Sequence, residues 1–172
     1  MYLRFSRLCR KSCIWTSRRL KIEYTNRRVR SIALLCFEEG IMPYKMNDKQ
    51  YEAVLALDSF KRFDHFISKV ADWEQLWGVK SDEGWLVPVA PEDFEYFPLW
   101  PHHEYAQKIV DENFPEHKAV EISLEDLIGH WLPLFAEDKV KVAVFPNQDW
   151  TFWCIEPEEL KEELLNEMAK YG

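Results

Sequence analysis

The fold is decided by the stretch 140-VKVAVFPNQDWTFWCI-155. Two runs rich in β-branched and aromatic residues, 140–145 and 150–155, flank the turn-forming residues 146–149. Short runs of this composition on either side of a Pro-Asn-Gln-Asp turn are typical of two antiparallel strands joined as a hairpin. The stretch therefore predicts a sheet and excludes an all-helical domain.

On both sides of the hairpin, helical and strand-like segments alternate. The expected helices are 48–57, 59–70, 103–114, 123–131 and 157–171, and the further strands are 76–79, 85–89, 95–100 and 119–122. Asn47 or Asp48 can cap the first helix, Asp58 or Ser59 the second, and Ser123 the fourth, and Pro157 suits a first helical turn. The order α-α-β-β-β-α-β-α-β-β-α predicts a single α+β domain, with helices flanking a mostly antiparallel or mixed sheet.

Apolar residues at helical spacing define the faces that we expect to be buried. On the second helix this stripe begins at Phe60, and on the last helix it ends at Tyr171. The second strand, 85–89, contains Pro88, which predicts that it lies at an edge or ends early.

The charge of the chain changes sign near residue 45. Residues 1–45 hold 11 Lys or Arg against 3 Asp or Glu, whereas residues 46–172 hold 11 against 27, which gives net charges of +8 and −16. One folded domain seldom divides its charge in this way. We therefore expect two parts, a basic N-terminal extension (1–45) and an acidic α+β domain (46–172).

Three interpretations of the extension remain open. Its many arginines and few acids resemble a targeting peptide, although no cleavage site follows. The same arginines suit an arm that binds nucleic acid or an anionic membrane. We favour a third interpretation, in which the segment is disordered or is translated from a start assigned too early, because codons for residues 38–40 form a purine-rich run just before Met42 and Met46.

Several classes of protein are disfavoured for residues 46–172. Their one cysteine, Cys154, cannot form an internal disulfide, which suits a reducing cytoplasm. No run has the apolar length of a membrane span, and no glycine-rich phosphate loop is present. The acidic balance repels nucleic acid. We expect a cytoplasmic protein with no cofactor, no metal, no membrane contact and no nucleic-acid binding by this part.

Five short motifs follow one another in a characteristic order. They are Trp77-Gly78, Gly84-Trp85, 98-PLWPH-102 with Tyr105-Ala106, Trp131-Leu132-Pro133 and 142-VAVFP-146. In this order they resemble a bacterial family, domain of unknown function 2750, over about residues 50–170. The resemblance implies a small bacterial cytoplasmic protein, and it implies no activity, cofactor or catalytic residue.

Chemistry could reside in the loop 98–105, where His102, His103 and Glu104 are adjacent. Imidazole and carboxylate groups suit zinc or iron, but neighbouring side chains at a helix start point in different directions and no metal-binding spacing is present. Helix capping and surface packing are therefore the simpler roles for these residues. Cys154 lies within an apolar strand, where a buried thiol is unreactive.

Tryptophan is in excess, with seven of the eight residues after position 45. Tryptophans fill cores, and they also line grooves for peptides or proteins. Core packing is favoured for most of them, while Trp100, beside a proline, and Trp150, at a turn, are expected to be exposed. The candidate binding residues are Trp100, His102, His103, Tyr105 and Trp150.

These features favour a non-enzymatic protein-binding domain. The net charge of −16 after residue 45 would steer a basic protein partner, as in a regulatory or immunity-like protein that covers a basic toxin or enzyme. The alternative is a small-ligand-binding or metal-binding domain, or an enzyme, that uses the loop 98–105.

Overall fold

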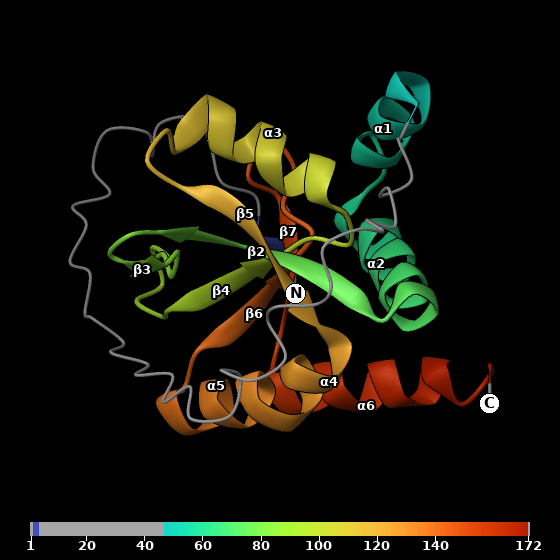
Figure 1. Cartoon of the computed structure of the whole chain (residues 1–172). Coiled ribbons are helices and arrows are strands. Elements are labelled where there is room, and N and C mark those ends of the chain that lie inside the picture. The colour runs from blue at the N-terminus through green and yellow to red at the C-terminus, as the bar shows by residue number, and fades with distance from the viewer. Residues whose placement is uncertain (1, 4–46, 172) are drawn as a thin grey trace, which may run out of the picture.

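The computed structural model describes residues 2–3 and 47–171 (Figure 1). Apart from Tyr2 and Leu3, the predicted extension 1–45 lies outside the described residues, so its three interpretations stay predictions. The helices are α1 (Asp48–Leu55), α2 (Ser59–Trp73), α3 (His103–Asn113), α4 (Leu124–Asp126), the π-helix η2 (Leu127–Trp131), α5 (Leu132–Asp138) and α6 (Pro157–Met168). The strands are β1 (Tyr2–Leu3), β2 (Gln75–Ser81), β3 (Gly84–Trp85), β4 (Tyr96–Leu99), β5 (Lys118–Ser123), β6 (Lys141–Val144) and β7 (Phe152–Ile155). The α+β class is confirmed.

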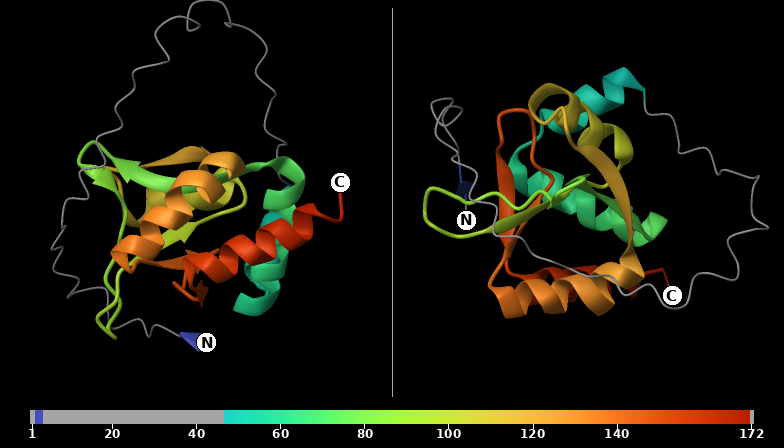
Figure 2. Two further views of the ribbon diagram at one scale, coloured as in Figure 1. Left: turned by 90° about the horizontal axis from the view of Figure 1, so that it is seen from below. Right: turned by 60° about the vertical axis from the view of Figure 1, so that its left-hand side comes forward.

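The helices cover the strands from several sides (Figures 1 and 2). Helix α3 packs against β2 and β5, while α2 packs against β7 and α6. Helices α4, α5 and α6 run along the lower side in Figure 1, and the left panel of Figure 2 looks directly onto them. No helix in the described part of the chain is both long and apolar enough to cross a membrane.

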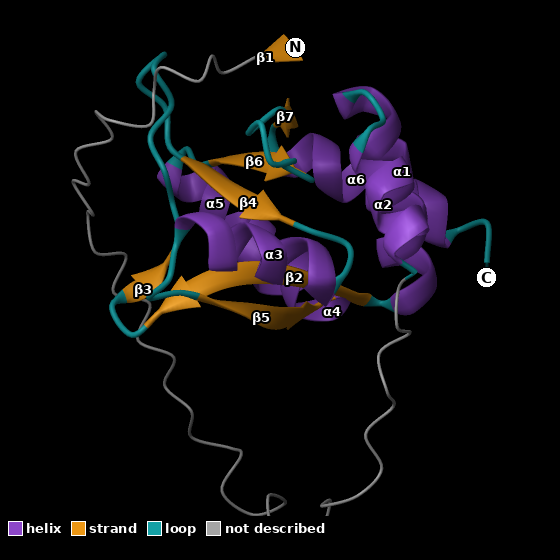
Figure 3. Cartoon of the chain, turned by 90° about the horizontal axis from the view of Figure 1, so that it is seen from above, coloured by secondary structure: helices purple, strands orange, loops and turns teal. Residues whose placement is uncertain are grey.

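The strands form two sheets and not the one sheet that the sequence predicts (Figure 3). The first has the order β1-β7-β6-β4, with β6 and β7 joined as the predicted antiparallel hairpin and β4 parallel to β6. The second has the order β3-β2-β5 and is antiparallel. A single antiparallel bridge between Trp77 and Trp100 connects the two. The loop after β3 carries the chain from one sheet to the other, and this long-range choice has no local sequence signal.

Close packing explains why the motifs Trp77-Gly78 and Gly84-Trp85 occur together. A Cβ atom at Gly78 would lie 2.8 Å from the Trp85 ring and 3.3 Å from the Phe97 ring. The glycine therefore leaves room for the Trp85 indole to lie over β2. Strand β3 contains only Gly84–Trp85 and lies at the edge of its sheet, so Pro88 correctly predicted an early end.

Predicted caps are confirmed at three helices. Asn47, Asp58 and Ser123 each accept a hydrogen bond from a backbone N–H in the first turn that follows. The helix predicted at 123–131 continues to Asp138 through η2, where the Leu132 N–H bonds to Leu127 O, five residues back. This wider turn accommodates Pro133 at the start of α5, since proline has no N–H to donate.

Two predicted core residues are exposed. Phe60 is 48% exposed, because it lies in the first turn of α2, where its ring contacts Phe63 on the same helix and Trp153 at the edge of the sheet. Tyr171 is 59% exposed, because α6 ends at Met168 and the chain then leaves the core. Both predictions extended a helical stripe past the point where the helix has a packing partner.

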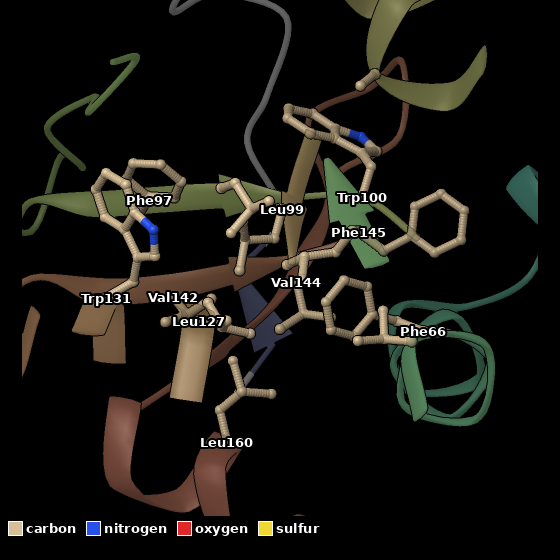
Figure 4. Close-up of a cluster of buried hydrophobic side chains, with 14 of the residues drawn as sticks. Phe66, Phe97, Leu99, Trp100, Leu127, Trp131, Val142, Val144, Phe145 and Leu160 are labelled. Carbon is tan, nitrogen blue, oxygen red and sulfur yellow. The ribbon is translucent and has the colours of Figure 1, made fainter. Parts of the chain in front are cut away.

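The core lies between the sheets and the helices (Figure 4). It draws buried side chains from every layer: Phe66, Phe97, Leu99, Trp100, Leu127, Trp131, Val142, Val144, Phe145 and Leu160. Trp100 and Trp131 are part of this core, and Trp77, Trp85, Trp150 and Trp153 pack against it while partly buried, as the preferred interpretation of the tryptophan excess predicts.

Candidate functional site

A pocket of about 250 Å³ lies at the carboxyl end of β4, among α1, α2 and the start of α3. It is lined by Gln50, His65, Lys69, Trp73, Pro101, His102 and Tyr105. Three of these residues come from one face of α2, where positions 65, 69 and 73 are spaced by four. Two more, Pro101 and His102, belong to the link between β4 and α3. The pocket therefore lies at the carboxyl end of β4, which pairs in parallel with β6. Ligands commonly bind at the carboxyl ends of parallel strands.

His102 is fixed in the wall of this pocket. Its side chain is only 4% exposed, and its Nδ1 accepts a hydrogen bond of 3.2 Å from the Glu104 N–H as the N-cap of α3. The capping role predicted from the sequence is confirmed, whereas the expected surface position of His102 is wrong, because the ring is buried among Trp73 and Tyr105. Because Nδ1 is an acceptor here, the neutral imidazole carries its proton on Nε2, which makes that atom a donor.

Lys69 supplies the positive charge of the pocket. Its Nζ lies 5.0 Å from the centroid of the Trp73 ring, within the range of a cation–π contact. Among the described residues it forms no ion pair. Burial, followed by the charge of Lys69, lowers the pKa of His65 below its ordinary value. His65 is therefore neutral at pH 7.

Tyr105 adds a buried phenol. Its ring stacks on Tyr51 with 4.9 Å between centroids, and its side chain is 1% exposed. Within the described residues neither tyrosine hydroxyl has a hydrogen-bond partner. Burial is the main cause that raises both pKa values, that of Tyr51 to about 12. An unsatisfied buried hydroxyl costs about 1–3 kcal/mol, so these two groups mark a place where the fold is not optimised for stability alone.

Of the five predicted site residues, only His102 and Tyr105 line the pocket. Trp100 is fully buried, and its Nε1 donates to Pro146 O at 2.9 Å, so the expectation that it is exposed is wrong. Trp150 is partly buried, and its Nε1 donates to the Tyr96 hydroxyl at 3.1 Å. His103 instead meets the Trp77 ring edge-on, 4.8 Å between centroids.

The sequence prediction missed the contribution of α2. Its positions 65, 69 and 73 lie on the side of the helix away from the predicted apolar stripe, where polar residues are usually solvated. The sequence does show a histidine, a lysine and a tryptophan at intervals of four residues on that polar side. These three residues line a pocket only because α1 and α3, from other parts of the chain, pack beside them.

Other candidate chemistry finds no geometric support in the described residues. No group of three or more His, Cys, Asp or Glu lies together in a way that could hold a metal ion. Burial raises the pKa of Cys154, which keeps this side chain as a thiol at neutral pH.

A second surface is formed by the outer side of α4, α5 and α6, which we call the acidic helical layer (Figure 2). Its exposed carboxylates are Glu125, Asp126, Glu137, Asp138, Glu156, Glu158, Glu159, Glu162 and Glu163. Within the described residues only Glu156 of this set forms an ion pair, with Lys141. The layer therefore presents a largely uncompensated negative charge.

The chain belongs to a family of proteins of unknown function, DUF2750, whose model matches residues 63–164. The match begins within α2 and ends within α6, so it includes the two sheets from β2 onward and most of both surfaces. The resemblance inferred from the tryptophan and proline motifs is confirmed. No curated protein and no solved structure shows significant similarity to the chain.

Proposed function

We propose that this domain is a non-enzymatic protein-binding domain, and that its acidic helical layer docks a basic protein partner. The observation that carries the proposal is the set of exposed carboxylates on that layer, of which only Glu156 is ion-paired among the described residues. A regulatory or immunity-like protein that covers a basic toxin or enzyme is one concrete form.

The energetics of α6 support this role. Glu158 and Glu159 lie in the first turn, where the helix dipole favours them. Glu162 and Glu163 lie one turn further on, four residues after the first pair. Like charges at this spacing destabilise a helix by about 0.2–0.5 kcal/mol per pair. A basic partner would remove this repulsion.

The layer also offers an apolar contact. Leu165 is 46% exposed, and it follows Glu158 and Glu162 at helical spacing on the same side of α6. An apolar centre with a charged rim is the usual composition of a protein interface. The charged rim would speed association with a basic protein in a salt-dependent way. The single cysteine after residue 45, Cys154, supports placing this interaction in a reducing cytoplasm.

The test is affinity capture from the native host with the full chain and two matched triple variants. The first variant carries Glu158→Gln, Glu162→Gln and Glu163→Gln in the layer. The second carries the same change at three exposed carboxylates of the β3-β2-β5 side, Glu83, Glu116 and Glu121. We expect a basic protein that binds the wild type and the second variant, and binds the first at least about tenfold more weakly at low salt.

Each other outcome counts against the proposal. If both variants lose the partner equally, net charge and not the layer determines binding. If no protein distinguishes the first variant from the wild type, the layer is not an interface.

A second candidate function is small-ligand binding at the loop 98–105. The specific observation that favours it is the pocket, which takes Pro101, His102 and Tyr105 from this loop.

A further inference from the structure

The pocket has a charge opposite to that of the domain around it. Residues 46–172 carry 27 acidic and 11 basic side chains, yet none of the residues that line the pocket is an Asp or Glu. The one lining residue with a permanent charge is Lys69. A local reversal of charge in a concave site indicates the sign of the ligand that the site accepts.

Lys69 is available to a ligand because no carboxylate in the described residues pairs with it. Its Nζ is held 5.0 Å from the centroid of the Trp73 indole, which restricts the lysine to the pocket side of α2. A lysine that is partly withdrawn from water and is not engaged in an ion pair binds an anion more strongly than a solvated lysine does.

Hydrogen-bond donors surround this charge from other elements. His102 has its proton on Nε2, because Nδ1 accepts from the Glu104 N–H at 3.2 Å. Gln50 contributes a side-chain amide from α1. Lys69, His102 and Gln50 therefore bring cationic and neutral N–H groups to one small site, the combination that carboxylate and phosphate oxygens require.

The remaining walls are flat and apolar. Trp73 and Tyr105 are aromatic, Pro101 is a rigid ring, and the Trp73 and His102 rings meet edge-on at 5.9 Å. A volume of about 250 Å³ is slightly below the range of about 300–1,000 Å³ that is usual for ligand pockets. The site thus suits a compact molecule with one flat ring or short planar chain.

We propose that this pocket binds a small planar organic anion, whose carboxylate or phosphate group is held by Lys69 and His102 and whose apolar body lies against Trp73. The inference specifies the second candidate function and is independent of docking at the acidic helical layer. Tyr105, 1% exposed and with an unpartnered hydroxyl, supports it as a buried polar group in the wall of the site.

The experiment compares three molecules of one shape and different charge: benzoate, benzamide and benzamidine. Binding to the full chain is followed by the shift of the Trp73 indole N–H in nitrogen–proton NMR spectra, with Trp73→Phe used to assign that signal. We expect benzoate to bind with a Kd on the order of 1 mM or below, and benzamide and benzamidine at least about tenfold more weakly. Phenyl phosphate and inorganic phosphate, measured in the same way, distinguish a phosphate preference from a carboxylate preference.

Two variants locate the charge. Lys69→Gln should raise the Kd of benzoate by about tenfold or more, the loss of one charge-assisted hydrogen bond. Lys80→Gln is the matched control, because Lys80 also lies over a tryptophan ring, that of Trp85 at 5.4 Å, but outside the pocket. This control should leave the Kd unchanged.

The outcomes distinguish a failure of the anion assignment from a failure of the second candidate function, small-ligand binding. If benzamide or benzamidine binds as well as benzoate, the pocket is a ligand site and the anion assignment is wrong. If none of the anions or analogues shifts the Trp73 signal at concentrations up to about ten times the expected Kd, the pocket is not a ligand site, and both the second candidate function and the anion assignment are wrong. An equal effect of Lys69→Gln and Lys80→Gln would show that overall charge, and not this site, governs binding.

Discussion

Replacing Arg62 by methionine should strongly destabilise the domain. Arg62 is 1% exposed, and its guanidinium joins α2 to the preceding link after α1 and to both sides of the distant β6–β7 turn. Its Nε donates to Phe145 O at 3.1 Å, and its Nη2 donates to Thr151 O at 2.6 Å and to Thr151 Oγ1 at 2.9 Å. Its Nη1 donates to Leu57 O, at the end of the α1 segment.

The magnitude follows from the groups that the substitution leaves without a donor. A hydrogen bond from a charged donor contributes about 1.5–3 kcal/mol, and a buried carbonyl without a partner costs about 1–3 kcal/mol. Methionine fills a similar volume but donates nothing, and local relaxation would recover part of the loss. We expect a decrease of about 3–5 kcal/mol in the free energy of unfolding, in line with the removal of one member of a buried polar network.

Backbone conformation makes these bonds important. Phe145 and Trp150, on either side of the β6–β7 turn, have φ values of 51° and 60°. Residues other than glycine are rare in this left-handed region, and holding one there costs about 1–3 kcal/mol. The Arg62 bonds to Phe145 O and to Thr151 O stabilise both sides of this turn.

The assay is equilibrium unfolding in urea, followed by tryptophan fluorescence and near-UV circular dichroism. Arg62→Lys keeps the charge but cannot bridge three carbonyls with one planar group, so it should lose an intermediate amount. Lys61→Met is the control from the neighbouring exposed position, whose 3.5 Å ion pair with Asp58 is screened by solvent and should contribute little to stability. A loss below about 1 kcal/mol for Arg62→Met, or full stability of Arg62→Lys, would refute the reasoning.

Two further predictions concern pH. Burial lowers the pKa of His65 and of His117 below 6.5, so the unfolded chain binds protons more readily, and the free energy of unfolding should fall as the pH drops from about 6.5 towards 5. Urea titrations at pH 7.5, 6 and 5 measure this, and His65→Gln should reduce the slope; an unchanged slope contradicts the assignment. At alkaline pH the sign is reversed, because burial raises the pKa of Tyr51 to about 12 while an unfolded tyrosine ionises near 10. Stability should therefore fall above pH 10, by up to about 2–3 kcal/mol from this group, and Tyr51→Phe should remove that part. At pH 7 the same variant should be more stable than the wild type by about 1–3 kcal/mol, because it removes a buried hydroxyl without a partner among the described residues. A loss of stability of Tyr51→Phe at pH 7 would show that the hydroxyl has a stabilising partner.

Local features of the sequence predicted most of the elements. Caps at Asn47, Asp58 and Ser123, and the turn before β7, each depend on a few neighbouring residues, and each is confirmed. Burial at the ends of elements was harder to predict. Phe60 and Tyr171 have the correct helical spacing, but their exposure depends on where a distant layer ends.

Long-range features account for the rest. Trp100 follows a strand and precedes a proline, which suggests exposure, but the bridge to Trp77 and the hydrogen bond to Pro146 O place it between the two sheets. The parallel pairing of β4 with β6 also depends on contacts between segments that are distant in sequence. Neither contact could be inferred from neighbours in the sequence, because each joins segments that lie at least 20 residues apart.

The net charge of the domain predicts an acidic surface such as the acidic helical layer, but it gives no indication of the positive charge in the pocket. A sum of −16 over residues 46–172 describes the potential far from the domain, where it would attract a basic protein and repel anions. At physiological ionic strength, however, exposed charges are screened beyond about 8 Å. The field inside a concave site is therefore set by its nearest charges, and in this pocket the nearest permanent charge among the lining residues is that of Lys69. An acidic protein can for this reason bind a basic partner on one surface and a small anion on another, and only the packing of α1, α2 and α3 brings the second site together.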